Sequence, residues 1–143
     1  MTWKALAIGS LVDVGGTMVF GFIYNFAYAV MLAAQGVAMA DIQQRILHDP
    51  SYFFAALLIG LAFVTAGGYV AARIARSRPM VHAGLVGLIG VLVGLLAVVG
   101  SKSIMWPHWF LLASNGLTVP AALIGALFGR RRAKPSAIQS RAA

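Results

Sequence analysis

Residues 5–34 read ALAIGSLVDVGGTMVFGFIYNFAYAVMLAA, an apolar run of about thirty residues whose one formal charge is Asp13. An α-helix rises about 1.5 Å per residue, so a helix of this length can cross a hydrocarbon core of roughly 30 Å. The small and polar residues of the run recur at helical spacing and share one face, which must point at protein or water. The stretch therefore predicts a membrane-spanning helix with an acid partway across it.

The composition of the whole chain points to the same class. Of its 143 residues, 61% are hydrophobic and 10% are charged, a balance too apolar for one water-soluble domain. The net charge of +8 would suggest nucleic-acid binding in a soluble protein. Here the basic residues flank apolar runs, where membrane orientation and anionic lipid explain them. We expect an integral membrane protein that contacts lipid and binds no nucleic acid.

Three further apolar runs follow the first, so we expect an all-α fold, an integral membrane four-helix bundle. A single domain is expected over residues 1–132, with a disordered tail after it at 133–143 and spans at about 5–34, 52–72, 80–100 and 105–129. The first run precedes Ala38-Met39-Ala40, a pattern typical of a cleaved secretory signal. A run of this length that contains an acid favours a retained helix instead.

Local signals predict how the spans begin and bend. Asp49 followed by Pro50 predicts a capped start for the second span. Ile42 and Ile46 lie four residues apart in the preceding loop, which indicates a short helix on the membrane surface. Pro120 removes a backbone donor in the middle of the fourth span, so we expect a kink or local unwinding there.

Small residues on the later spans allow close helix contact. The residues expected to pack helices together are Gly67, Gly68, Gly90, Gly94, Gly125 and Gly129. The third span has no ionisable group besides His82, near its start, so it is expected to act as scaffold. His82 could relay protons, but the interpretation as an interfacial histidine is favoured.

Basic residues predict the orientation of the chain. Nine of the eleven fall on one side of the four spans, namely Lys4, Arg73, Arg76, Arg78, Arg130, Arg131, Arg132, Lys134 and Arg141. Positive residues favour the cytoplasm, so both termini are expected to be cytoplasmic, in a multi-pass protein of the cell membrane. Lipid headgroups are the expected partners of Arg130, Arg131, Arg132 and Lys134.

Two resemblances add to this interpretation. Residues 67–76, GGYVAARIAR, with 82–88, HAGLVGL, resemble small uncharacterised bacterial four-span, glycine-rich membrane proteins. That likeness implies the architecture and a bacterial inner membrane, and it implies no activity. Residues 13–17, DVGGT, are similar to part of the opening helix of the small multidrug resistance transporters. In those dimers an acid binds protons and cationic drugs in turn, a role that would fall on Asp13, although that family has Glu at this place.

A polar cluster is expected near the middle of the membrane. Counting about 1.5 Å per residue from opposite ends, Asp13 and Asn115 reach nearly the same depth. The candidate polar or ion site contains Asp13, Thr17, Asn115, Thr118 and Thr65, provided that the first and fourth helices are neighbours. An acid at this depth could carry a proton or bind a cation. The alternative is that these side chains only hydrogen-bond the helices together.

Two functions therefore stay open. The first is a helical scaffold, accessory or lipid-contacting subunit that self-associates through its glycine faces. The second is a small oligomeric transporter or channel that couples to protons or cations through Asp13. No nucleophile with a base and no metal-ligand spacing is evident, His48 and His108 included, so we expect neither an enzyme nor a cofactor or metal.

Overall fold

The structure is a computed structural model that describes residues 3–75, 77–100 and 106–130. The described residues form α1 (Trp3–Ser10), the π-helical turn η1 (Leu11–Gly15), α2 (Gly16–Ala34), α3 (Met39–Leu47), α4 (Pro50–Ile74), α5 (Pro79–Gly100) and α6 (His108–Arg130). Four helical stretches are long and apolar enough to cross a membrane, at Trp3–Ala34, Pro50–Ile74, Pro79–Gly100 and His108–Gly129. The prediction of an all-helical chain with four such helices is confirmed.

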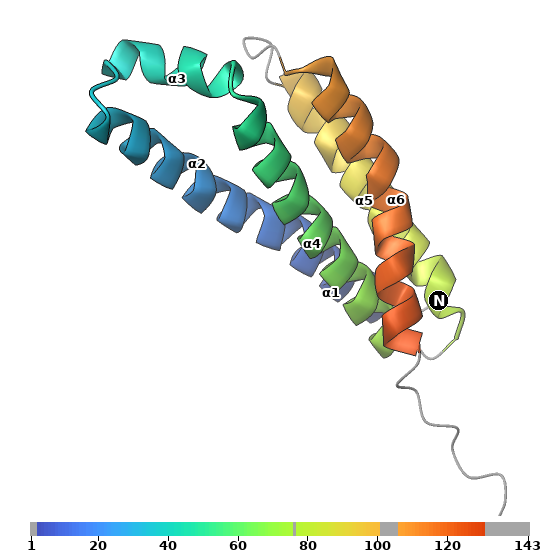
Figure 1. Ribbon diagram of the computed structural model, residues 1–143. Helices are drawn as coiled ribbons and strands as arrows, with labels where there is room; N and C mark the ends of the chain where they lie inside the picture. The colour runs from blue at the N-terminus through green and yellow to red at the C-terminus, as the bar shows by residue number, and fades with distance from the viewer. Residues whose placement is uncertain (1–2, 76, 101–105, 131–143) are drawn as a thin grey trace, which may run out of the picture.

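Helix α4 is the centre of the arrangement. It packs against α1, η1 and α2 of the first span and against α5 and α6, and α1 and η1 also pack against α5. The rod formed by α1, η1 and α2 crosses the bundle at an angle, so that α1 lies close to the other helices while α2 leans away from them (Figure 1). The first and fourth spans are therefore separated by α4 over most of their length, so they are not the neighbours that the predicted polar cluster assumed.

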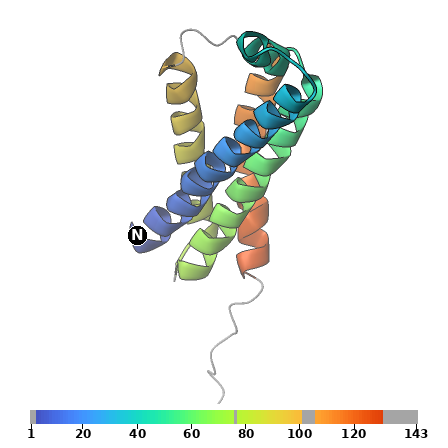
Figure 2. The same ribbon diagram turned by 90° about the vertical axis from the view of Figure 1, so that its left-hand side faces the viewer.

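The helix ends fall into two groups (Figures 1 and 2). The start of α1, the end of α4, the start of α5 and the end of α6 lie together at the end where the helices converge. At the opposite end, α2 and α4 are joined by α3, which lies across the top of the pair in Figure 1. The first and last described residues, Trp3 and Arg130, thus lie at the same end of the bundle.

Glycines let α4 approach helices on both sides of it. A Cβ atom added to Gly67 would lie 2.7 Å from the carbonyl oxygen of Gly9 on α1. A Cβ added to Gly68 would overlap the backbone of Ala122 on α6, and one added to Gly125 would overlap the carbonyl oxygen of Thr65. Real side chains cannot occupy these positions without moving a helix, so small residues set the spacing here.

At the end opposite the convergent one, here called the splayed end, an aromatic and aliphatic cluster packs α2, α3 and α4 together. Ile42 and Ile46 of α3 are buried, and the apolar cluster that they form also contains Leu32, Tyr52 and Phe53. The short helix predicted around Ile42 and Ile46 is thus present, but its apolar face packs on α2 and α4. The sequence pattern alone could not distinguish these neighbours from lipid.

Asp49 caps α4 as predicted. Its Oδ1 atom accepts a hydrogen bond of 2.9 Å from the backbone nitrogen of Ser51, and Pro50 occupies the first turn. The hydroxyl of Tyr28 on α2 donates to Oδ2 of the same carboxylate. This hydrogen bond lowers the pKa of Asp49 below its ordinary value. The cap of α4 is therefore also a link between α2 and α4.

The helices depart from the local signals in two places. Helix α6 continues through Pro120, so the local unwinding that Pro120 predicted does not occur, while a kink there stays a prediction. Gly116 and Pro120 are both exposed, on the outer side of α6, where a change in backbone hydrogen bonding disturbs no packed neighbour. An irregular turn that the sequence did not predict occurs in the first span, and it contains Asp13.

Candidate functional site

Asp13 lies on the π-helical turn at the point where the rod leaves the bundle. One extra residue in a turn moves a side chain relative to a regular helix, and such turns are frequent at functional sites. The residue is 2% exposed. Its Cβ atom lies 2.8 Å from the position of a Cβ on Gly67, and its Oδ2 atom lies 2.8 Å from the position of a Cβ on Gly90. Glycines on α4 and α5 thus leave the space that this side chain occupies.

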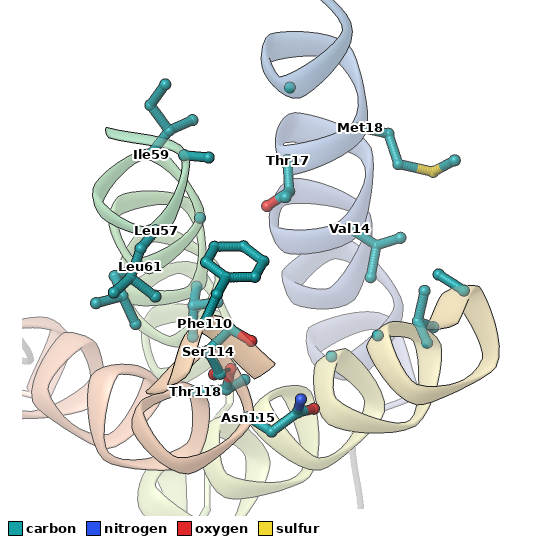
Figure 3. A pocket seen from close by; sticks show the side chains of 18 of the residues that line it. Val14, Thr17, Met18, Leu57, Ile59, Leu61, Phe110, Ser114, Asn115 and Thr118 are labelled. Carbon is teal, nitrogen blue, oxygen red and sulfur yellow. Dashed lines mark hydrogen bonds between the residues drawn. The ribbon is translucent and has the colours of Figure 1, made fainter. Parts of the chain in front are cut away.

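A cavity of about 500 Å³ adjoins Asp13. It lies between α2, α4, α5 and α6, and Figure 3 shows Thr17 pointing into it from the side opposite α4. Ser114, Asn115 and Thr118 of α6 line it as well. Most of its remaining wall is apolar, from residues such as Leu57, Leu61, Val64, Val93 and Phe110. The result is an apolar chamber with a carboxyl group at one end.

The polar residues of α6 form hydrogen bonds within their own helix. The Asn115 side-chain nitrogen donates to the carbonyl oxygen of Leu111 over 2.8 Å. The hydroxyls of Ser114 and Thr118 likewise donate to carbonyl oxygens one turn earlier. These interactions leave the side-chain oxygens of Asn115 and Thr118 as acceptors.

Three buried oxygen atoms of the first span have no hydrogen-bond partner among the described residues. They are Oγ of Ser10, Oδ2 of Asp13 and Oγ1 of Thr17. A buried polar atom without a partner costs free energy, most of all when the group is charged. A proton, a cation or another donor on Asp13 would remove this cost.

The structure brings together four of the five side chains that were expected to form the polar site. Asp13, Thr17, Asn115 and Thr118 all line the cavity. Thr65 does not line it, and its hydroxyl donates over 2.7 Å to the carbonyl oxygen of Leu61, one turn earlier in α4. The other four side chains come from the first span and from α6, which α4 separates. They meet at the cavity, where α5 lies next to both groups.

Gly90 and Gly94, which were expected to pack helices together, face polar side chains of the site. They line the cavity, and the oxygens of Asp13 and Asn115 face them. A Cβ on Gly90 would also lie 3.3 Å from a methyl carbon of Thr118, while one on Gly94 would lie 3.6 Å from Oδ1 of Asn115. The glycines of the third span therefore form a wall of the polar site, and Gly125 and Gly129 pack on α4.

Sequence reasoning missed the polar groups at the opposite end of the cavity. Tyr24, Asn25, Tyr52 and Trp106 line it there. The Asn25 side chain donates to the hydroxyl of Tyr52 over 2.8 Å, and the rings of Tyr24 and Tyr52 stack with centroids 5.0 Å apart. Only the fold shows that Tyr24 and Asn25 of α2 face Tyr52 of α4.

The remaining predicted residues lie away from the cavity. His82 is 2% exposed, and its Nδ1 atom donates over 3.1 Å to the carbonyl oxygen of Arg78. His82 lies in the first turn of α5, near the end of a candidate span, and its position at the membrane interface stays a prediction. Arg130 ends α6, while Arg131, Arg132, Lys134 and the expected tail lie outside the described residues. No group of three His, Asp or Glu side chains that could hold a metal occurs in the described part of the chain.

No protein-family model, curated protein or solved structure matches this chain. The function is therefore argued from the geometry of the cavity.

Proposed function

We propose that the chain is a small membrane-embedded carrier that binds a proton or a cation at Asp13. The observation that supports this proposal is the unpartnered Oδ2 atom of Asp13, next to a cavity of about 500 Å³. Acidic side chains inside a membrane are costly and usually serve ion or proton pathways. The cavity has the volume of an ordinary small-molecule site.

The scaffold hypothesis explains the same residues less well. If the polar side chains served to hold the helices together, their hydrogen bonds would run between helices. The hydrogen bonds of Thr65, Asn115 and Thr118 instead return to the backbone of their own helix. Close helix contact through Gly67, Gly68 and Gly125 favours a rigid frame, which a carrier also needs.

The proposal includes a location and an orientation. Lys4, Arg73 and Arg78 belong to the convergent end of the bundle, and Arg45 belongs to α3 at the splayed end. By the positive-inside rule the convergent end faces the cytoplasm and the cavity lies toward the outer leaflet. The membrane is proposed to be a bacterial inner membrane, with anionic lipid near the basic end and self-association of the chain as a further expectation.

The experiment is infrared spectroscopy of the carboxyl bands in phosphatidylcholine vesicles between pH 4 and pH 9. The Asp13→Asn variant identifies the Asp13 band by difference, since the chain has only three acidic side chains. We expect the Asp13 band to titrate in this range and to shift when tetraphenylphosphonium, a membrane-permeant cation, is added.

A band that neither titrates nor responds to the cation would refute the carrier proposal. If, in addition, Asp13→Asn changed only the melting temperature, the scaffold hypothesis would hold. Asp41→Asn serves as the matched control, because Asp41 is exposed on α3 and lies outside the cavity. It should leave the Asp13 band unchanged.

A further inference from the structure

We infer that the cavity takes a single-chain amphiphile with a primary ammonium head, which enters from the membrane between α2 and α5. The inference rests on the proposed function, since it names the class of cation that reaches Asp13. Three features carry it: where the cavity opens, which hydrogen-bonding groups its closed end presents, and how apolar its walls are.

The cavity opens sideways, between α2 and α5. Met18 on α2 and Val93 on α5 both line the cavity, yet they are 69% and 38% exposed. A residue that lines a cavity and is also exposed lies at its mouth. Helix α2 packs on α3 and α4 and has no comparable packing on α5. Both helices are long and apolar enough to cross a membrane, so this mouth faces hydrocarbon.

The closed end of the cavity presents acceptors. Oδ2 of Asp13 has no hydrogen-bond partner among the residues that the structure describes. The amide nitrogen of Asn115 donates to Leu111, which leaves the side-chain oxygen of Asn115 facing Gly94. The Thr118 hydroxyl is also used as a donor, so its oxygen can accept. The described residues that line the cavity include no Lys, Arg or His. Such a set favours a head group with a positive charge and several N–H donors.

A primary ammonium group meets this requirement and a carboxylate or phosphate does not. A quaternary ammonium carries the charge without N–H donors, so it would satisfy Asp13 only through the electrostatic attraction. The walls beyond the acceptors are apolar, from residues such as Val14, Met18, Leu57 and Val93. They suit an alkyl chain, which a ligand from the membrane would already carry.

The experiment uses the full chain in phosphatidylcholine vesicles that contain dodecylamine with a photoactivatable diazirine on its alkyl chain. Labelled residues are mapped by mass spectrometry after illumination. We expect labels on the cavity-facing residues of α2 and α5, with Met18 and Val93 among them. Unlabelled dodecylamine should reduce this labelling at least tenfold and dodecanoate less than twofold, while dodecyltrimethylammonium, which offers the charge without N–H donors, should compete more weakly than dodecylamine.

Two variants with controls test the head group and the mouth. Asp13→Asn keeps the size of the side chain and should lower cavity labelling at least tenfold, while Asp41→Asn should leave it unchanged. Gly21→Phe should slow labelling, because Gly21 lines the cavity close to Met18 in the sequence, and a Cβ there meets nothing within 4 Å, so the position accepts a larger side chain that narrows the mouth. Ile23→Phe on the lipid side of the same helix should label like the wild type, since Ile23 is 54% exposed.

Several results would overturn the inference. Competition by dodecanoate equal to that by dodecylamine would refute the ammonium head, and equal rates for Gly21→Phe and Ile23→Phe would refute entry between α2 and α5. A second copy of the chain across the mouth would also refute it. That arrangement would appear as disulfide-linked dimers of Met18→Cys, whose thiol would be the only one in the chain. The proposed function would still be supported if the labelling experiment failed while the infrared band of Asp13 titrated and responded to tetraphenylphosphonium.

Discussion

Replacing Gly90 with alanine tests the position of the Asp13 carboxyl group. The new methyl group would lie 2.8 Å from Oδ2 of Asp13. An ordinary contact begins near 3.4 Å, so the oxygen must withdraw by about 0.6 Å (3.4 − 2.8). Turning the carboxyl group away from its preferred angle costs about 0.5–1.5 kcal/mol. Alanine favours a helix over glycine by up to about 1 kcal/mol, so the free energy of unfolding should stay within about 1 kcal/mol of the wild type.

The carboxyl group itself should report the change. We expect the infrared band of Asp13 to shift in Gly90→Ala, because the group has moved relative to α5 while the fold is intact. Gly94→Ala is the matched control one turn away, since its methyl group would lie 3.6 Å from Oδ1 of Asn115 and displace nothing. The geometry of the site would be wrong if Gly90→Ala left the band in place, or if Gly94→Ala shifted it equally.

Two further changes test the frame around the site. Gly125→Ala should lower the free energy of unfolding in detergent by about 1–3 kcal/mol, because its methyl group overlaps the carbonyl oxygen of Thr65. Gly60→Ala should not lower the free energy of unfolding, because a Cβ on Gly60 meets nothing within 4 Å. Equal losses of stability in the two variants would contradict the close contact at Gly125. Tyr28→Phe should lower the free energy of unfolding by about 0.5–1 kcal/mol, because it removes a hydrogen bond to the Asp49 carboxylate. This value is below that of a buried charged hydrogen bond because the pair is only partly buried. Because this hydrogen bond lowers the pKa of Asp49, its contribution is present at neutral pH and is lost as the pH falls through that pKa. A difference between Tyr28→Phe and wild type that stayed constant from pH 7 to pH 3 in thermal melts would refute the link.

Much of the fold could be predicted from local sequence pattern. The length and apolar character of the runs predict helices that can cross a membrane, because the pattern depends only on residues close in sequence. The start of α4 was predicted for the same reason, since Asp49 and Pro50 act on the turn next to them. The π-helical turn was not predicted, because residues 11–15 have the same apolar pattern as a regular helix.

The site was predicted in part. The sequence alone determined that one acid lies within an apolar helix and that amide and hydroxyl groups lie at similar depth on another. Tertiary structure decided that Gly90, and not Thr65, faces Asp13. Tertiary structure also decided that the cavity beside Asp13 opens between α2 and α5. Side-chain identity fixes chemistry and depth along a helix, whereas neighbours depend on how whole helices tilt and rotate, which many weak contacts across the bundle set together.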